Sequence, residues 1–577
     1  MTWYRFPIAS LALISTLGCD STAALCGANE TRVGPGCVKT YEPASVKLNS
    51  VGFLPEHVKR ATLSGGDSDG TFRVLRAGDS EVAYLGSTSE ELDGSETRES
   101  GVRALDFSDF TEEGEFIVQA PGVGESPRFR IGRDVYTDVV RVLMLGLYGQ
   151  RCGEAVSFRH EGQDFEHGEC HTEDAWLDYY GKAEEKQPTL YGWHDAGDYG
   201  KYTNNGSFSL GMMLLAWQQF QPALERLTLE IPEQDGKFPD YLDECKFQLD
   251  WLLGMQLEDG SVADRVTTAT FDGMVSPEGS TARRRLSPPT TTATGDFVAV
   301  LSRAAHAFEP YDAELAATYR DAAARGWAYL IATPEDTTPP DKHATRLAFT
   351  GGYWSPDQDD RAWAAAEYWE LTGEAAAREA FETSVADARI GSYFDWRDLW
   401  NMGVFTYLLS AREDRNPEVV ASLTERVTAS AGAFRRSADD HPYGRPVDSQ
   451  YWWGINGVIA RTAMHLTVAD TLAPDPANKD AIALGLDHLL GRNFYGRSYL
   501  TGIGHDPPKA PHHRPSQADS ASLPWPGLLV GGPSEGTDAL PVALAWHDDS
   551  EDYRSNEIAI NWNAAMIYAA AALLPAD

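Results

Sequence analysis

Cysteine is scarce in this sequence, with 6 residues in a chain of 577. So low a density excludes a disulfide scaffold, in which many bridges hold a short chain together. Basic residues are also few, 48 against 86 acidic ones, and the net charge of −38 argues against nucleic acid or an anionic membrane as a partner. An uncharged or cationic partner such as a polysaccharide fits better. Keeping an exported protein soluble explains the charge equally well.

The N-terminus carries an apolar run that is too short to cross a membrane. Arg5 precedes it, the run extends from Phe6 to Leu17, and it ends in small residues, the order typical of a secretory signal. We therefore expect residues 1–19 to form a signal peptide and the protein to be exported. Leu17-Gly18-Cys19 also has the form of a bacterial lipoprotein cleavage site, which predicts a secreted protein or a cell-surface lipoprotein anchored through Cys19.

Residues 20–42 are rich in Gly, Thr, Ala and Cys, show no periodicity and are expected to form a linker, in which Cys26 and Cys37 can form a disulfide. Short runs follow from Val46 to about Ile131. TFRVL and EFIVQA are examples, and clusters of Gly, Asp, Ser and Glu separate them. This spacing predicts a small antiparallel sandwich of immunoglobulin type over residues 43–132.

Strand patterns are nearly absent after Arg133, which argues against a parallel α/β sheet. Apolar residues recur instead at helical spacing, beginning with Val135 and Val139. Similar segments follow near residues 206–222, 239–256, 292–308, 312–332, 360–372, 374–387, 396–411, 416–435, 450–470, 476–491 and 557–574. About twelve paired helices favour closure into a toroid, so residues 133–577 are expected to form a mainly α domain whose long connections carry functional loops.

The stretch YGWHDAGDYGKY, residues 191–202, has neither helical nor alternating periodicity and is expected to be a loop. Asp195 and Asp198 lie three positions apart, among glycines that allow tight backbone paths and aromatic rings that offer flat apolar faces. One carboxylate can hold a water molecule while the other orients it. An Asp-rich surface turn is the plainer interpretation, but the aromatics and His194 favour a site.

Four side chains of metal-binding type occur between the first predicted helix and this loop: Cys152, Cys170, His171 and His194. Two thiolates and two imidazoles suit a closed tetrahedral Zn²⁺ site, which would staple the loop that carries Asp195. A disulfide between the two cysteines is the alternative in an exported protein. Four protein ligands leave no position for a catalytic water, so a structural Zn²⁺ is expected. No organic cofactor is expected.

A further carboxylate, Glu557, opens the last apolar helix within DYRSNEIAINWNAA. A glutamate at a helix start is commonly just a favourable partner of the helix dipole. Here Asn and Trp residues surround it. The preceding loop, TGIGHDPPKAPHHRPS, contains histidines and an arginine that can bind sugar hydroxyls.

With these segments the chain resembles glycoside hydrolase family 9, the endoglucanase and cellulase family, in its form with an N-terminal immunoglobulin-like domain. The matching motifs are KLNSVGFLPEHVKRA, YGQRCG, CHTEDA, GWHDAGDYGKY, PDYLDECKFQLDWLLGMQ, YWWGIN, SYLTGIGHDPPKAPHHR, LLVGGP and DYRSNEIAINWNAA. The resemblance covers nearly everything after the linker. It implies an (α/α)6 barrel behind the all-β sandwich and hydrolysis of β-1,4-glucosidic bonds with inversion. We expect the enzyme to be a monomer.

The resemblance also implies roles for single residues. Asp198 matches the general base, Asp195 its partner on the water, and Glu557 the general acid. Glu557 must stay protonated, so apolar cover and nearby carboxylates are expected to raise its pKa, while Asp198 stays ionised. Further matches are His512 and Arg514 of the substrate-binding H-x-R and the four residues of the zinc set. Asp548 and Tyr553 match the acid's motif and are also expected to bind substrate.

Family members often bind calcium where TGGYWSPDQDDRAWAAAEYW stands here. The implied oxygen ligands are Asp357, Asp359, Asp360 and Asp398. The usual Asp-Glu pair is Asp-Asp in this chain, and a solvated acidic helix start explains the pattern equally well. Candidates for stacking on sugar are Trp193, Trp453 and Trp562, although a Trp in a helical barrel more often belongs to the core.

Two departures from the family pattern concern specificity. The segment after the MQ motif is DGSVADRV, without the usual basic residue near a Gly-Val pair, and Asp506 replaces an Asn or Lys upstream of H-x-R. They allow an exo-acting cellodextrinase or a glucosaminidase, whose cationic polymer would suit so negative a chain. A non-catalytic glycan-binding protein and a hydrolase that uses the zinc are the alternatives from other classes.

Overall fold

The computed structural model describes residues 44–575 except 67, 234, 339–348, 389, 391–392, 448–450, 520–521 and 535–540, together with the backbone of 30–33 and 36–39. The predictions for the signal peptide, Cys19, Cys26 and the Cys37 side chain lie outside the described residues. Within the expected linker, β1 (Glu30–Val33) and β2 (Gly36–Lys39) pair as an antiparallel hairpin. No described helix is long and apolar enough to cross a bilayer.

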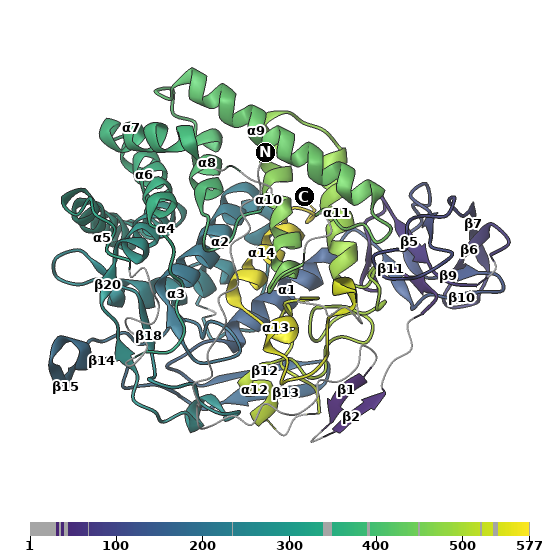
Figure 1. Ribbon diagram of the computed structural model, residues 1–577, viewed down its shortest axis with the longest axis horizontal. Helices are drawn as coiled ribbons and strands as arrows, with labels where there is room; N and C mark the ends of the chain where they lie inside the picture. Colours follow the sequence, from purple (N-terminus) through teal and green to yellow (C-terminus); the bar gives the residue numbers. More distant parts are fainter. Residues whose placement is uncertain are drawn as a thin grey trace, which may run out of the picture.

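The small domain is a sandwich of two sheets that lies beside the helical domain (Figure 1). In β6, Phe72 and Val74 are buried while Thr71 and Arg73 are exposed, the alternation of a strand with one face on a core. One sheet has the order β4 (Gly52–Phe53), β11 (Phe129–Ile131), β9 (Gly114–Ala120), β6 (Thr71–Arg76) and β7 (Val82–Ser87), with β10 (Gly124–Glu125) paired to β9. The other has the order β3 (Val46–Lys47), β5 (Arg60–Leu63) and β8 (Arg103–Asp106).

Two rings of helices form the large domain, and the inner ring closes because each helix contacts the next and the last contacts the first. The inner helices are α2 (Thr203–Leu224), α4 (Thr291–Phe308), α6 (Gln358–Thr372), α8 (Trp400–Leu409), α10 (Ile455–Leu472) and α14 (Ile560–Ala571). The outer helices are α1 (Val135–Gly149), α3 (Asp240–Met255), α5 (Ala313–Ala332), α7 (Ala375–Ser384), α9 (Pro417–Asp440) and α11 (Ala477–Leu489). The predicted (α/α)6 barrel is therefore confirmed.

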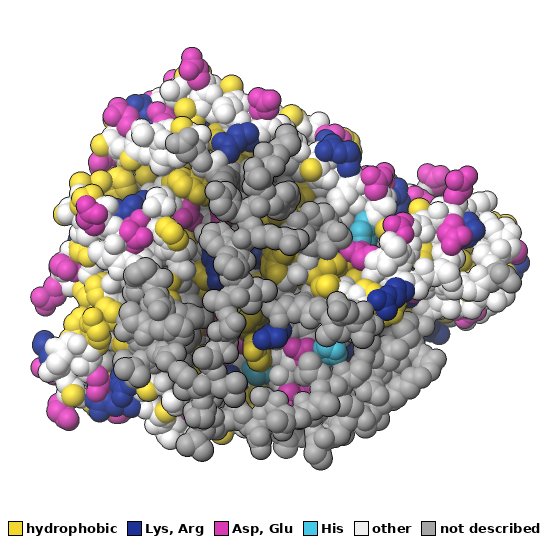
Figure 2. Space-filling view, viewed as in Figure 1, with side chains coloured by type: hydrophobic (Ala, Val, Ile, Leu, Met, Phe, Trp, Pro, Cys, Tyr) yellow, Lys and Arg dark blue, Asp and Glu magenta, His cyan; other side chains and the backbone are white. Residues whose placement is uncertain are grey.

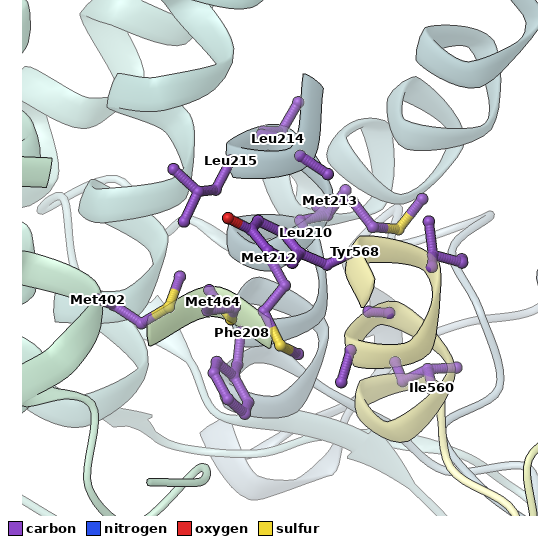
Figure 3. Packing of buried hydrophobic residues seen from close by; sticks show 14 of the residues in the cluster. Phe208, Leu210, Met212, Met213, Leu214, Leu215, Met402, Met464, Ile560 and Tyr568 are labelled. Carbon is purple, nitrogen blue, oxygen red and sulfur yellow. The ribbon is translucent and has the colours of Figure 1, made fainter. Parts of the chain in front are cut away.

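Sequence explains which helices lie inside. In α14 every residue is buried, as expected of a helix that is apolar or small on all sides. Outer helix α9 instead buries one stripe at helical spacing, which includes Leu423, Val427 and Phe434. Figure 3 shows the centre of the barrel, where residues of α2 such as Phe208 meet Met402 of α8, Met464 of α10 and Ile560 of α14.

The long connections contain strands and short helices that the sequence pattern did not indicate. Most have two or three residues, too few to produce a detectable alternation. The strands are β12 (Val156–His160), β13 (Gln163–His167), β14 (Trp176–Leu177), β15 (Lys182–Lys186), β16 (Lys201–Tyr202), β17 (Val262–Ala263), β18 (Arg265–Thr267), β19 (Arg285–Leu286) and β20 (Pro289–Thr290). The helices are α12 (Arg514–Ala518), α13 (Tyr553–Asn556) and the 3-10 turns η1 (Asp178–Tyr180), η2 (Pro277–Gly279), η4 (Val385–Asp387) and η5 (Val542–Leu544).

Buried polar contacts join the sandwich to the barrel. Asn49 Nδ2 donates to Asp487 Oδ1 of α11 at 2.9 Å, and the Ser50 amide donates to Leu490 O at 3.1 Å. Beyond α11, backbone bonds continue toward the C-terminal segment, from Tyr499 N to Leu489 O (2.9 Å), Val530 N to Tyr499 O (3.1 Å) and Gly531 N to Glu557 O (2.8 Å). Acidic side chains are spread along the outline of the face shown in Figure 2, in keeping with the net charge.

Candidate active site

The loop before β16 carries both predicted aspartates. Asp195 is 2 % exposed; its Oδ1 accepts a hydrogen bond from Asn205 Nδ2 at 2.7 Å, and its Oδ2 accepts one from the Tyr353 hydroxyl. Burial raises the pKa of Asp195 to about 7, the two hydrogen bonds oppose the rise, and the charge of Asp198 adds to it. Asp198 is half-buried and accepts from the Gly200 amide at 3.1 Å. The pair therefore offers one buried and one accessible carboxyl group.

Glu557 lies directly beside this loop, although the two are far apart in the sequence. Ala196 and Ala559 form an antiparallel bridge, and the Gly197 amide is near enough to the Glu557 carboxyl group to oppose part of the rise in its pKa. Burial raises the pKa of Glu557 well above that of an ordinary glutamic acid, and the nearby aspartates raise it further. The rise that a general acid requires is therefore present.

The His512–Arg514 segment lies against both carboxylate-bearing segments. His512 pairs with Glu557 in a parallel bridge, and a Cβ at Gly197 would be 2.2 Å from His512 O, so glycine is needed there. Arg514 donates from one terminal nitrogen to Gly197 O at 2.8 Å and from Nε and the other terminal nitrogen to Asp272 O at 3.1 and 2.9 Å. Its guanidinium thus links the loop of Gly197 to the loop of Asp272.

Two exposed aromatic rings stand next to this segment. Trp453 is 48 % exposed and Tyr553 is 42 % exposed; their ring centroids are 5.3 Å apart, and Tyr553 lies 6.1 Å from the His512 ring. Trp193 is only 1 % exposed and donates from Nε1 to a buried carboxylate, while Trp562 is 8 % exposed and packs beneath glycines. Side chains so buried offer no face to a sugar, so Trp193 and Trp562 belong to the core and the expected stacking role is corrected for both.

Asp548 is buried, and its carboxylate accepts several hydrogen bonds. It accepts from a terminal nitrogen of Arg497 at 2.7 Å, from the Lys509 amide at 3.0 Å and from the Ala510 amide at 2.8 Å. These bonds hold the chain just before His512. Asp548 is 2 % exposed, and its predicted contact with substrate stays a prediction.

The four predicted metal ligands are brought together. One donor atom each from Cys152, Cys170, His171 and His194 lies within 4.8 Å of the others, and both cysteines are free thiols. Burial lowers the pKa of His194 to about 3, which keeps its ring neutral, the state that binds a metal. The rings of His171 and His194 pack against Tyr199, which follows Asp198 in the loop, with centroids 5.6 and 4.8 Å away. The group fits a metal ion with two sulfur and two nitrogen ligands.

The predicted calcium ligands are less closely gathered. Among the described residues, the cysteine and histidine set is the one group of three or more metal-ligand side chains that meets within 4.8 Å. Asp357 pairs with Arg361 at 2.7 Å, and Asp359 accepts from the amide of residue 399, next to Asp398. Burial raises the pKa of Asp359 to about 7 and that of Asp360 well above its usual range, with nearby carboxylates adding to both. The aspartates therefore form a cluster of buried carboxyl groups at the start of α6, whose ionised forms repel one another.

Comparison with known proteins places this geometry in a family. A sequence profile of glycosyl hydrolase family 9 matches residues 136–570, and one of the cellulase N-terminal ig-like domain matches residues 42–125. The chain belongs to glycosyl hydrolase family 9.

Two relatives and one solved structure are similar along most of their length. Endoglucanase D of Acetivibrio thermocellus is 41% identical over 94% of this chain and 86% of the relative. A xyloglucan-specific endo-beta-1,4-glucanase of Bacteroides ovatus is 30% identical over 92% of this chain and 93% of the relative. A Zn-binding triple mutant of a family 9 endoglucanase has a TM-score of 0.84 and 30% identity, covering 91% of this chain and 100% of that one.

Three residues around Asp195 in this family 9 enzyme were not anticipated: Gln150, Asn205 and Tyr353. Asn205 and Tyr353 occupy the two oxygens of Asp195, and Gln150 bonds the backbone on either side of it. Gln150 and Tyr353 stand inside motifs that were noticed, YGQRCG and TGGYW. Nothing in the residue types distinguishes them from their neighbours, because their role depends on contacts with segments distant in sequence.

Proposed function

We propose that this family 9 enzyme is an inverting endoglucanase that cleaves β-1,4-glucosidic bonds in cellulose or related β-glucans. The observation that carries the proposal is the backbone pairing of the Asp195–Asp198 loop with the Glu557 segment, in the bridge between Ala196 and Ala559. It puts a carboxyl group of raised pKa beside a half-buried aspartate, the combination that acid and base catalysis on one glycosidic bond requires.

In the proposed step, Glu557 gives its proton to the glycosidic oxygen as the bond from that oxygen to the anomeric carbon breaks. A water molecule attacks the opposite face of the anomeric carbon, Asp198 accepts the proton of that water, and Asp195 helps to hold it. One water is consumed and the new reducing end has the α configuration. Proton exchange with solvent then returns both carboxyl groups to their starting states.

The substrate class rests on the relatives and on the exposed rings. Endoglucanase D and the xyloglucan-specific endo-beta-1,4-glucanase act on β-1,4-linked glucans by name. Trp453 and Tyr553 supply apolar faces of the kind that bind pyranose rings. His512 lies between these rings and Glu557 and is proposed to bind sugar hydroxyls, with Arg514 supporting the same segment.

A substrate panel tests this proposal. Amorphous cellulose, mixed-linkage glucan, xyloglucan, cello-oligosaccharides and chitosan are compared for product length and, by NMR, for the first anomer released. Endo action on glucan gives mixed oligosaccharides and the α anomer first. Release of short products from chain ends favours the exo-acting cellodextrinase, activity confined to chitosan favours the glucosaminidase, and binding without hydrolysis would leave only the glycan-binding protein.

We propose that Cys152, Cys170, His171 and His194 hold a structural Zn²⁺, which would fix the loop of Asp195. Cys152→Ser and Cys170→Ser are expected to reduce the zinc content from about one ion per chain to near zero and to lower Tm. Mass spectrometry of the metal and thermal unfolding check this. Cys245→Ser is the matched control, because Cys245 is also a buried free thiol. Zinc-free protein with unchanged Tm would contradict the structural role, and loss of activity in a fully stable apo-protein would favour the zinc hydrolase.

The Ca²⁺ site at Asp357, Asp359, Asp360 and Asp398 stays a prediction, supported by buried carboxylates whose mutual repulsion a cation would relieve. Titrating Ca²⁺ into the zinc-loaded protein is expected to raise Tm, and Asp359→Asn with Asp360→Asn is expected to remove that rise. Mg²⁺ at the same concentration is the control. An equal rise with Mg²⁺, or one that survives both substitutions, would contradict a specific site.

We propose that the protein is exported by a signal at residues 1–19 and then anchored through Cys19, with a linker over residues 20–42, and that it acts as a monomer. The support is the charge and length pattern of the N-terminus. In a bacterial host that processes lipoproteins, mass spectrometry is expected to find a mature chain that begins at Cys19 and carries a lipid mass. Cleavage at another position, without added mass, would instead indicate a freely secreted enzyme.

A further inference from the structure

Gln150 is a buried side chain that reaches three segments at once. It follows the last residue of α1 and is 1 % exposed. Its Nε2 donates to His194 O at 3.2 Å and to Ala196 O at 3.1 Å, the carbonyl groups on either side of Asp195. Its backbone carbonyl accepts from the His194 amide at 2.7 Å. The side-chain amide of Gln150 therefore holds the backbone on both sides of Asp195.

The opposite end of the same amide bonds the substrate-side segment. His513 Nδ1 accepts from the Ser516 amide, and burial lowers the pKa of His513, so its neutral ring carries the proton on Nε2. That nitrogen donates to Gln150 Oε1 at 2.9 Å. His513 stands between His512 and Arg514. One glutamine thus connects the base loop to the segment that pairs with Glu557.

The contacts of Ala196 add the third segment, since Ala196 bridges to Ala559 just after Glu557. A shift of Ala196 would therefore change the base loop and its distance from the acid together. Gln150 has no accessible surface with which to touch a glucan, so it acts on the reaction only through these neighbours.

We propose that Gln150 is a positioning residue for hydrolysis, which sets the Asp195–Asp198 loop against the His512–Arg514 segment and Glu557. This inference rests on the proposed function. A misplacement of reacting groups by about 1 Å can cost on the order of 100-fold in rate. Loss of the Gln150 bonds is therefore expected to lower kcat by about 10- to 100-fold, with KM changed much less, because the exposed binding rings are not among its contacts.

The test compares Gln150→Met with Gln256→Met. Gln256 is a matched control: it is also buried, its Nε2 donates to Gly260 O and Ala322 O, and its Oε1 accepts from Arg325, none of which belongs to the three segments. Both substitutions remove three side-chain hydrogen bonds with little change in shape: two donated to backbone carbonyl groups and one accepted from another side chain, His513 or Arg325. They are expected to lower Tm similarly, while the large loss of kcat on cello-oligosaccharides occurs in Gln150→Met alone.

Two further readouts separate positioning from general damage. Zinc content is expected to stay at the wild-type level in Gln150→Met, because the ring of His194 is untouched. Gln150→Glu keeps an oxygen for His513 but turns a carboxylate toward two carbonyl groups, so its kcat is expected to fall at least as far. The loss is also expected with a dinitrophenyl cellobioside, because the base is needed whatever the leaving group.

The outcomes decide the inference separately from the proposed function. Hydrolysis of glucan by the wild type is measured first, and its absence would sink the proposed function. With an active wild type, equal kcat values for Gln150→Met and Gln256→Met overturn the assignment, whether both are high or both are low. Wild-type activity in Gln150→Glu overturns it as well, and so does a loss that tracks zinc content.

Discussion

Glu557→Gln is expected to reduce kcat on amorphous cellulose by about 10²- to 10⁴-fold, the range that one proton-transfer group contributes. Glutamine has the size of glutamic acid, but it has no proton to give to the departing oxygen. The glucan leaving group therefore departs as an alkoxide. Reducing-sugar release measures the loss, and an unchanged Tm shows that the fold is intact.

Two measurements show whether Glu557→Gln loses activity because it lacks a proton for the leaving group: the dependence of the rate on the leaving group, and its dependence on pH. A dinitrophenyl cellobioside needs no protonation, so Glu557→Gln is expected to retain much of its activity on that substrate. Wild-type activity on cellulose should fall as pH rises through the pKa of Glu557. That limb should lie well above the ordinary value of 4.5, because burial and the aspartates raise this pKa. The variant should lack the limb.

Glu551→Gln is the matched control for this substitution, because Glu551 is exposed in the same segment. It should leave both the rate and the basic limb unchanged. Full cellulose hydrolysis by Glu557→Gln, or a loss of equal size on both kinds of substrate, would refute the role of the general acid.

Asp198→Asn is expected to abolish hydrolysis to a similar extent, about 10²- to 10⁴-fold, but without dependence on the leaving group. The carboxylate of Asp198 is the proposed acceptor of the water proton, and an amide has no comparable basicity. The half-buried side chain contacts the Gly200 amide, which an amide oxygen can still bind, so stability should change little. Kinetics on cellulose and on the dinitrophenyl cellobioside measure both losses.

Asp109→Asn, an exposed change in the small domain, is the control and should be neutral. Rescue of Asp198→Asn by a better leaving group would contradict the assignment of the base. Activity that survives in Asp198→Asn but not in Asp195→Asn would transfer the role to Asp195, whose pKa of about 7 leaves it largely protonated in acid.

Helix positions followed closely from apolar periodicity, because a helix that packs on a core must place apolar residues every three or four positions. The segment expected near 312–332 is α5 (Ala313–Ala332), and that near 476–491 is α11 (Ala477–Leu489). Closure of the ring depends on contacts such as α14 with α2, which no local pattern contains. The number of paired helices favoured closure, and the family resemblance implied the (α/α)6 barrel.

For the site, residue types predicted some side-chain roles, while other roles depend on contacts that form only in the fold. Residue types and their neighbours pointed to the aspartates and the metal set, whereas the predicted role of Glu557 came from the family resemblance. Types could not separate Trp453, which is exposed, from Trp193, which is buried, since tryptophan occurs both in cores and on sugar-binding surfaces. The role inferred for Gln150 depends on three distant segments meeting at one amide, and a linear sequence carries no signal for such a meeting.

The backbone bonds that lead from Ser50 through Leu490 and Tyr499 to Glu557 bear on how hybrid enzymes could be assembled. Through these bonds the sandwich supports the segment that carries Glu557, so we expect that it cannot be replaced by an unrelated sandwich without disturbing that segment. In a hybrid whose sandwich comes from one enzyme and whose barrel comes from another, the residues on the two sides of this interface would not match. A hybrid that takes both domains from the same enzyme, with the junction within residues 20–42, keeps this interface intact.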